Sequence, residues 1–175
     1  MKRLLLLAVT LLLAACYAEM DWRELYWEEG RVKAMLPAKP AKMGREVIIA
    51  GVPVPMEMLQ VQLKGMAFGV AYAPMPGPDP AKALAGARDV LVKNIEGHLV
   101  EDREVDVPGA TGKGREFRAE GVVAGTPMLV AGRVATDGER LYEVVFVGRK
   151  DKTEPVDLDL FLGSLRIVPG GGTAR

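Results

Sequence analysis

The side chains that most often carry out enzymatic chemistry are scarce in this sequence. His98 is its one histidine, Cys16 its one cysteine and Ser164 its one serine. A catalytic serine needs a histidine beside it, and neither His98 nor Ser164 lies in the Gly-x-Ser-x-Gly pattern that exposes a nucleophile at a strand–helix turn. A zinc ion needs several His, Cys or carboxylate ligands, and one histidine with one cysteine disfavours such a site. We therefore expect no catalytic residue, metal or cofactor, and interpret Ser164 as a capping or packing residue and His98 as a solvated one.

The glycine-rich stretch GATGKG at residues 109–114 resembles a phosphate-binding loop at first sight. The P-loop motif needs glycine six residues before its lysine and serine or threonine directly after it. Around Lys113 these positions hold Val107 and Gly114, so the motif fails. The stretch is predicted to be a flexible loop between two strands.

Two methionines, Met56 and Met58, are spaced so that an extended strand would place them on one face. Thioethers are soft ligands that could hold Cu(I) in an oxidising compartment. Methionine also fills irregular gaps in cores and lines adaptable binding surfaces. Three interpretations of this face therefore stay open: core packing, a partner-contact patch and a copper site.

Five polar side chains are predicted to gather on neighbouring strands: Glu116, Arg118, Glu120, Arg133 and Tyr142. If turns at Gly125-Thr126 and Asp137-Gly138 set the strand register, Arg118 lies opposite Arg133, with Tyr142 on the other side of Arg133. The two glutamates would then be diagonal neighbours on the same face.

Such a cluster is open to more than one interpretation. It can be a solvated charge ladder that discourages edge-to-edge pairing of strands. It can also be a ligand or partner contact, in which Arg118 and Arg133 hold a small anion or a peptide. A hydrolase or transferase would instead use Glu116 and Glu120 as a carboxylate pair, and would need a concave site in which the two converge.

Apolar periodicity and turn signals predict ten strands and two helices. The strands are expected at residues 22–27, 31–36, 47–50, 56–63, 66–73, 99–107, 115–123, 128–136, 140–147 and 166–168. The helices are expected at 80–97, with Asp79 as N-cap, Pro80 in the first turn and Gly97 as the C-terminal stop, and at 154–165. Within 66–73, one face carries bulky residues and the other only Ala and Gly, which predicts that the longer helix packs closely on the small face.

The first residues have the parts of a bacterial export signal. Lys2 and Arg3 precede an apolar run that ends in Leu13-Ala14-Ala15-Cys16. Ten apolar residues in a helix span about 15 Å, too short to cross a bilayer, and small residues before a cut are typical of a signal peptide. Cysteine directly after Leu-Ala-Ala resembles the lipobox, in which a lipoprotein peptidase cleaves before a lipidated cysteine. We therefore expect a lipoprotein signal peptide over 1–15 and a membrane anchor on Cys16.

Size and charge limit what the mature chain can be. After the signal peptide we expect a lipidated tether over 16–21, one domain over 22–168 and a disordered tail over 169–175. Lys2 and Arg3 are the only charges before Cys16, and the whole chain has 23 basic and 23 acidic residues, so the mature chain has two more acidic than basic residues. This balance gives no basic excess for nucleic acid, which we exclude as a partner.

Several short motifs occur in order along the mature chain. They are Trp22 followed by GRVKAMLP at 30–37 and Pro40, the helix 80–97, Pro108-Gly109 followed by GREF at 114–117, RLY at 140–142 and FLGSLRI at 161–167. In this combination they resemble small bacterial lipoproteins of the Mog1/PsbP-like class. The resemblance implies an α+β fold in which an antiparallel sheet is flanked by one long and one short helix.

The class is better known for binding and assembly than for catalysis. The resemblance therefore implies a membrane-anchored, non-catalytic binding or assembly factor, with an unknown protein partner or small ligand. A carboxylate-dependent enzyme and a purely structural envelope protein stay as alternatives. We expect the domain in the periplasm, on the outer rather than the inner membrane.

Overall fold

The computed structural model describes residues 20–153 and 156–169. The expected signal peptide, the first four residues of the tether and the end of the tail lie outside the described residues. The described elements are β1 (Arg23–Trp27), β2 (Val32–Leu36), β3 (Ala41–Ile49), β4 (Val52–Leu63), β5 (Met66–Pro74), α2 (Pro80–Asn94), β6 (His98–Val105), β7 (Gly114–Val123), β8 (Thr126–Thr136), β9 (Arg140–Arg149), the 3-10 turn η2 (Lys150–Lys152), α3 (Leu158–Gly163) and β10 (Arg166–Ile167).

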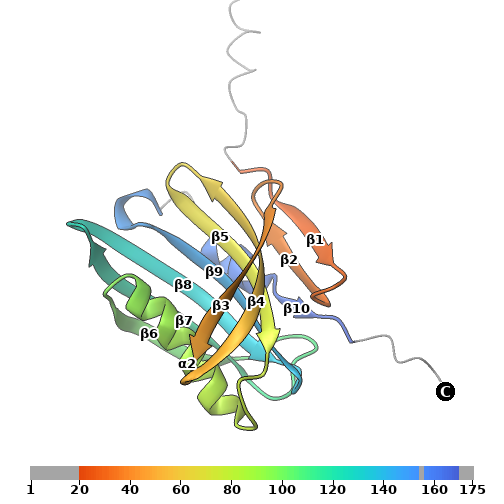
Figure 1. Ribbon diagram of the computed structural model, residues 1–175. Coiled ribbons are helices and arrows are strands. Elements are labelled where there is room, and N and C mark those ends of the chain that lie inside the picture. The colour runs from red at the N-terminus through yellow and green to blue at the C-terminus, as the bar shows by residue number, and fades with distance from the viewer. Residues whose placement is uncertain (1–19, 154–155, 170–175) are drawn as a thin grey trace, which may run out of the picture.

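The strands form two antiparallel sheets (Figure 1). The larger has the order β3-β4-β5-β9-β8-β7-β6, and the smaller has the order β1-β2-β10. A first core lies between the two sheets and includes α3, and a second core lies between the larger sheet and α2. The predicted α+β class, with an antiparallel sheet flanked by one long and one short helix, is confirmed. Among the described residues, no helix is long and apolar enough to cross a membrane.

Strand β5 shows why the larger sheet has two different cores. Its bulky residues, including Phe68 and Val70, are fully buried in the first core. Its small residues Ala71 and Ala73 lie in the second core, which also contains Ala87 and the rest of the buried face of α2. The helix therefore lies on the predicted side of the sheet, but it comes closest to β7 and β8 and not to β5 as predicted.

Helix α2 begins as predicted and ends slightly differently. The Asp79 carboxylate accepts a hydrogen bond from the backbone N–H of Lys82, with Pro80 in the first turn. At the other end, Glu96 and not Gly97 adopts the left-handed conformation, with φ of 50°. Gly97 is needed for another reason: a Cβ there would lie 2.7 Å from the Glu120 carbonyl oxygen on β7. The predicted role of Gly97 as the residue that stops the helix is therefore wrong.

The turns that set the register of β7, β8 and β9 differ from the two turns predicted from the sequence. The β7–β8 turn is Ala124-Gly125, both with positive φ, so Val123 pairs with Thr126. The β8–β9 loop has four residues between the paired Thr136 and Leu141. Each shift is by two residues, so every side chain keeps its predicted face but gains different neighbours.

The other differences are in element length. Strand β3 starts at Ala41 instead of residue 47, and β4 starts at Val52 despite Pro53 and Pro55. These prolines pair only with β3, because pairing of β4 with β5 begins at Glu57. A proline lacks the N–H of a ladder and is tolerated where one side of the strand has no neighbour.

Candidate functional site

Glu116 and Arg133, two members of the predicted polar cluster, form a buried ion pair. Arg133 on β8 lies opposite Glu116 on β7, and not opposite Arg118 as the predicted turns required. Its Nε donates to Glu116 Oε2 at 2.9 Å, and Arg103 on β6 donates to the other carboxylate oxygen. Glu116 is only 4% exposed. Burial alone would raise the pKa of Glu116, but hydrogen bonds from the two arginines outweigh it and hold the pKa below the usual value.

Arg118 and Glu120 have separate partners. Arg118 Nη2 donates to Asp159 on α3 at 3.0 Å, and Lys150 donates to Glu120 Oε2 at 2.6 Å. Each carboxylate of the proposed Glu116–Glu120 pair is thus matched by its own cations. Glu116 is bound by two arginines and its pKa is lowered, so it stays ionised. A general acid needs the opposite, a carboxyl group that holds its proton. A role of the five residues in ligand or partner contact stays a prediction.

Tyr142, the fifth residue, lies opposite Ala135 and belongs to a different network. Its hydroxyl donates to Asp137 Oδ2 at 2.8 Å, and Arg31 Nη2 donates to the same oxygen at 2.8 Å. Burial and the bond to Asp137 raise the pKa of Tyr142 to about 12. Since Arg31 directly precedes β2, this network ties the β8–β9 loop to the smaller sheet.

The same carboxylate explains why the Asp-Gly pair did not form the expected two-residue turn. Asp137 Oδ1 accepts hydrogen bonds from the backbone N–H groups of Glu139 and Arg140, at 3.0 and 2.8 Å. Burial would raise the pKa of Asp137, but these bonds and that from Tyr142 outweigh it and keep the pKa lowered. An aspartate that caps its own loop stabilises the longer, four-residue connection.

The remaining candidates are placed in packing roles or on the surface. Met56 and Met58 are both buried in the second core, which fits the core-packing interpretation. Ser164 Oγ accepts from the Met35 backbone N–H and donates to the Phe161 carbonyl oxygen, so its predicted capping role is confirmed. His98 is exposed at the start of β6. Among the described residues, no group of three or more His, Cys, Asp and Glu side chains could hold a metal ion.

Sequence reasoning missed one buried carboxyl group. Glu143 on β9 is 2% exposed and lines a small space with Met56 and Arg45 beside α2. Burial raises its pKa to about 7, although the charge of Arg45 acts in the opposite direction. The available signal was a single charge between Leu141 and Val145, within a largely apolar predicted strand.

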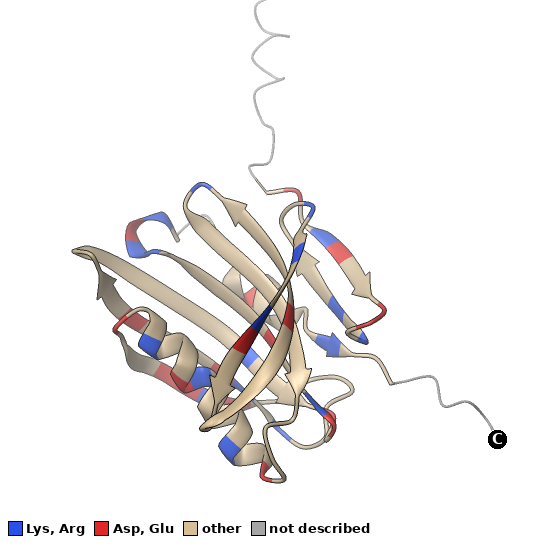
Figure 2. Cartoon of the chain, in the orientation of Figure 1, with Lys and Arg blue, Asp and Glu red and all other residues tan. Residues whose placement is uncertain are grey.

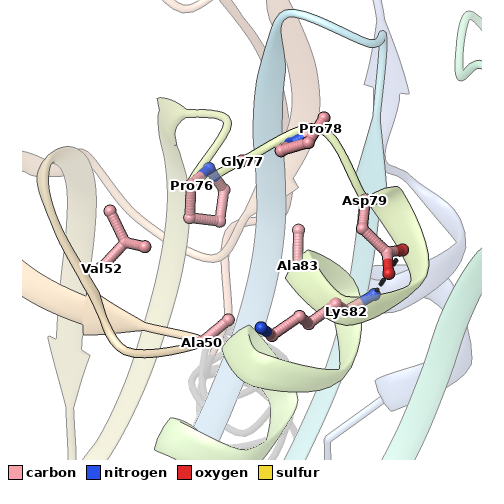
Figure 3. A pocket seen from close by; sticks show the side chains of 8 residues that line it. All are labelled: Ala50, Val52, Pro76, Gly77, Pro78, Asp79, Lys82 and Ala83. Atoms are coloured by element: carbon pink, nitrogen blue, oxygen red, sulfur yellow. Dashed lines mark hydrogen bonds between the residues drawn. The ribbon is translucent and has the colours of Figure 1, made fainter.

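Two cavities flank the first turns of α2. The first has a volume of about 270 Å³ and lies between the β3–β4 turn and the proline-rich connection from β5 to α2. Figure 3 shows Pro76 and Pro78 on the connection, with Ala50 facing them and the Lys82 ammonium reaching toward Ala50. Asp79 also lines this cavity, but its carboxylate is occupied by the helix cap.

The second cavity is larger, about 560 Å³, and lies between α2 and the loop that contains residues 111–114. Leu84 and Ala85 of α2 line it, together with Arg88 and Arg115. Both arginines bind the carboxylate of Asp102, Arg115 Nε at 2.9 Å from Oδ1. Residues 111–114, part of the stretch that failed as a phosphate loop, therefore line a cavity that has both apolar and charged residues in its lining.

Together the two cavities suit binding better than catalysis. A cavity lined by apolar residues together with a few charged groups is typical of ligand and peptide sites. Prolines before the helix and in its first turn limit the backbone freedom of the segment between the cavities, so a partner would meet a surface that is already ordered.

Comparison with known proteins adds information on the fold. No family model matches the sequence, and no curated protein matches it. A solved structure with a similar fold is the solution structure of cyanobacterial PsbP (CyanoP) from Synechocystis sp. PCC 6803, with a TM-score of 0.57 over 87% of this chain and 95% of that chain. The chain has a PsbP-like fold. At 13% identity the match concerns the fold alone.

This PsbP-like fold confirms the fold that the resemblance of the sequence motifs implied. The match does not test whether the protein is a lipoprotein, because the lipid anchor depends on residues before the described part of the chain. The lipid anchor therefore stays a prediction from the sequence around Cys16.

Proposed function

We propose that this protein is an envelope lipoprotein, anchored through lipid on Cys16, that binds a protein partner or small ligand without catalysis. The sequence Leu13-Ala14-Ala15-Cys16 supports the anchor. A periplasmic domain on the outer membrane is the location that we propose with it. The PsbP-like fold and the two cavities beside α2 support the binding role.

The position of the cavities relative to the tether carries the proposal. The backbone N–H of Asp21 binds the Pro37 carbonyl oxygen, so the tether enters beside the β2–β3 connection. Strand β3 then runs nine residues, about 30 Å, to Ala50 in the first cavity. Figure 1 shows the start of β1, just after Asp21, at the end of the molecule opposite the start of α2. A partner can therefore reach both cavities while the domain is tethered.

The anchor is tested by fatty-acid labelling in the host and by mass spectrometry of the mature N-terminus. Wild-type protein should begin at Cys16 and carry lipid, whereas Cys16→Ser should take up no label and keep its signal peptide. A mature N-terminus at any other residue would contradict the anchor.

The binding role is tested by filling the larger cavity. Ala85→Trp places an indole where Ala85 lines the cavity, and should abolish complementation of a deletion strain while circular dichroism and thermal melting stay unchanged. Lys93→Trp, exposed on the last turn of the same helix, is the matched control and should complement fully. Full complementation by a folded Ala85→Trp protein would remove this cavity from the proposal.

A further inference from the structure

Strand β3 forms one edge of the larger sheet, and within the described chain it pairs with β4 alone. It runs nine residues without a proline or a bulge, and every residue from Ala41 to Glu46 is exposed. The opposite edge, β6, has a bulge between Leu99 and Glu101. Bulges and prolines are common devices that keep an edge strand from pairing with another chain, and β3 has neither.

The pairing with β4 determines which backbone groups of β3 are free. Opposite residues of an antiparallel pair alternate between hydrogen-bonded and non-hydrogen-bonded positions. Glu46 and Ile48 lie opposite Pro55 and Pro53, which have no N–H group, so these positions are non-hydrogen-bonded. The N–H and C=O groups of the even-numbered residues of β3 therefore point away from β4, toward the open edge.

The charges of β3 match those of a second β3 in one antiparallel register. With Gly44 opposite Gly44 of the second copy, Lys42 lies opposite Glu46 of the second copy, and Glu46 lies opposite Lys42. An axis at residue 45 would instead place two Arg45 side chains opposite each other, and an axis at residue 46 two Glu46 side chains. Opposite charges stabilise a directly opposed pair and like charges destabilise it. Figure 2 shows basic and acidic segments close together along β3.

The same register gives Glu46 a cation. Glu46 has no ion pair within the described chain, whereas Lys42 lies 3.3 Å from Glu29 and 3.9 Å from Glu57. Lys42 is half-exposed, so a carboxylate of a second copy can reach it from the open edge. Ile48, which is 63% exposed, comes opposite Pro40 of the second copy.

We propose that β3 is a dimer interface, at which two copies of this chain pair edge to edge about a twofold axis at Gly44. Each copy contributes residues 41–47. The pairing ends before Ala50, which helix α2 approaches so closely that a Cβ on Gly86 would lie 2.7 Å from the Ala50 backbone nitrogen. Next to that contact, Val47 meets the small side chain of Ala41 of the second copy, so the strand fits beside the helix.

The axis is perpendicular to the sheet, so both copies carry α2 and its two cavities on the same face of one continuous sheet. The smaller sheets lie on the other face. Asp21 binds the Pro37 carbonyl oxygen directly after β2, so both tethers belong to that other face. The dimer does not depend on lipid at Cys16, but two anchored copies can form it on one membrane with their cavities accessible.

The test is disulfide crosslinking of the full-length protein in intact host cells. Gly44→Cys places two thiols opposite each other across the axis, at a Cα separation of about 5.5 Å, which a disulfide accepts. The new Cβ would lie 2.9 Å from Glu57 Oε1, at the end of a flexible side chain that can move aside. Val100→Cys, 51% exposed on β6, is the matched control.

Cys16 is the only natural cysteine, so the wild type reports any crosslink through that residue. On non-reducing gels after mild oxidation, Gly44→Cys should give a dimer, and Val100→Cys and the wild type should stay monomeric. Native mass spectrometry of the detergent-solubilised wild type should show the same dimer without an introduced cysteine.

Charge variants in the Gly44→Cys background test the register. Glu46→Lys places lysines opposite Lys42 of the second copy on both sides of the axis, and should slow crosslinking by about tenfold. Lys42→Glu combined with Glu46→Lys reverses both charges and should restore the rate. Glu104→Lys, exposed on β6, changes the net charge as much as Glu46→Lys and should have no effect.

Three results would overturn the proposal. Crosslinking of Gly44→Cys no faster than that of Val100→Cys, with a monomeric wild type in native mass spectrometry, would exclude the dimer. A rate unaffected by Glu46→Lys, or not restored by the double reversal, would exclude this register. A crosslinked product of any other mass would show that the open edge takes a strand from a different protein instead of a second copy.

Discussion

At the scale of single residues, the polar cluster on β7 and β8 is part of the packed structure. An exposed ladder of charges would tolerate the loss of one arginine with little effect. Glu116 is instead buried with two arginines bound to it, so removal of either one leaves a carboxylate whose desolvation is poorly compensated.

Arg133→Ala is therefore expected to lower the free energy of unfolding by about 1–3 kcal/mol, measured by urea denaturation. Arg118→Ala is the matched control on the neighbouring strand, because its partner Asp159 is mostly exposed, and should cost about 0.5 kcal/mol or less. Equal, small losses for both variants would mean that the Glu116 pair contributes no more than a surface ion pair.

Glu143 predicts a pH dependence of stability. Its pKa is about 7 in the folded protein and has the usual value near 4.5 in the unfolded chain, so the folded state binds more protons between these values. Stability contributed by this group is full below about pH 4.5 and falls as the pH rises to about 7, by roughly 3 kcal/mol. Glu143→Gln should be more stable than wild type at pH 8.

The measurement is urea denaturation of wild type and Glu143→Gln at several pH values between 4.5 and 8. The difference between the two proteins should grow with pH across this window and then level off. A constant difference would show that Glu143 has the same pKa in both states, and that Arg45 fully compensates its burial.

At the scale of elements, α2 connects the second core to the candidate site. Its buried face, which includes Leu84 and Leu91, packs on the larger sheet, while its first turns separate the two cavities. Packing of the helix on the larger sheet therefore also fixes the shape of both cavities.

Leu91→Asp should cost about 4 kcal/mol, because it places a carboxylate without a partner against the sheet. Lys93→Asp, two residues later and exposed, should change stability by about 0.5 kcal/mol or less. Thermal melting of the two variants under identical conditions is the measurement. Similar shifts in Tm would show that the helix packs through a different face.

At the scale of the whole molecule, aromatic side chains join the two sheets through the first core. Trp22 contacts Phe68 on β5 and Phe161 on α3, with ring centroids 5.7 and 6.0 Å apart, and Phe161 is fully buried. A core shared by both sheets predicts that they unfold together.

Phe161→Ala should destabilise the protein by about 4 kcal/mol through the cavity that it leaves. Tryptophan fluorescence follows the smaller sheet through Trp22 and Trp27, and far-ultraviolet circular dichroism follows the whole chain. The two unfolding curves should shift by the same amount. A fluorescence transition that precedes the dichroism transition would show that the smaller sheet unfolds separately.

Periodicity alone was enough to predict the type and position of most elements. The alternation in β5 correctly assigned its faces to two different surroundings, and Asp79-Pro80 correctly located the start of α2. Side chains alternate between the two faces of any strand, and an N-cap residue binds an N–H group only three residues later. Such short-range relations can be predicted from the order of residues.

Only the tertiary structure decided the register and the composition of the site. Asp137 lengthens its loop because it binds two local N–H groups, Tyr142 and Arg31 at once, and Arg31 is distant in sequence. The separate shift of two residues at the β7–β8 turn gave Arg133 a buried carboxylate as its partner. The cavities likewise lie between α2 and separate turns, so their volume depends on how layers pack and has no local signal. The sequence by itself determined which faces are apolar, and long-range packing determined which polar groups meet.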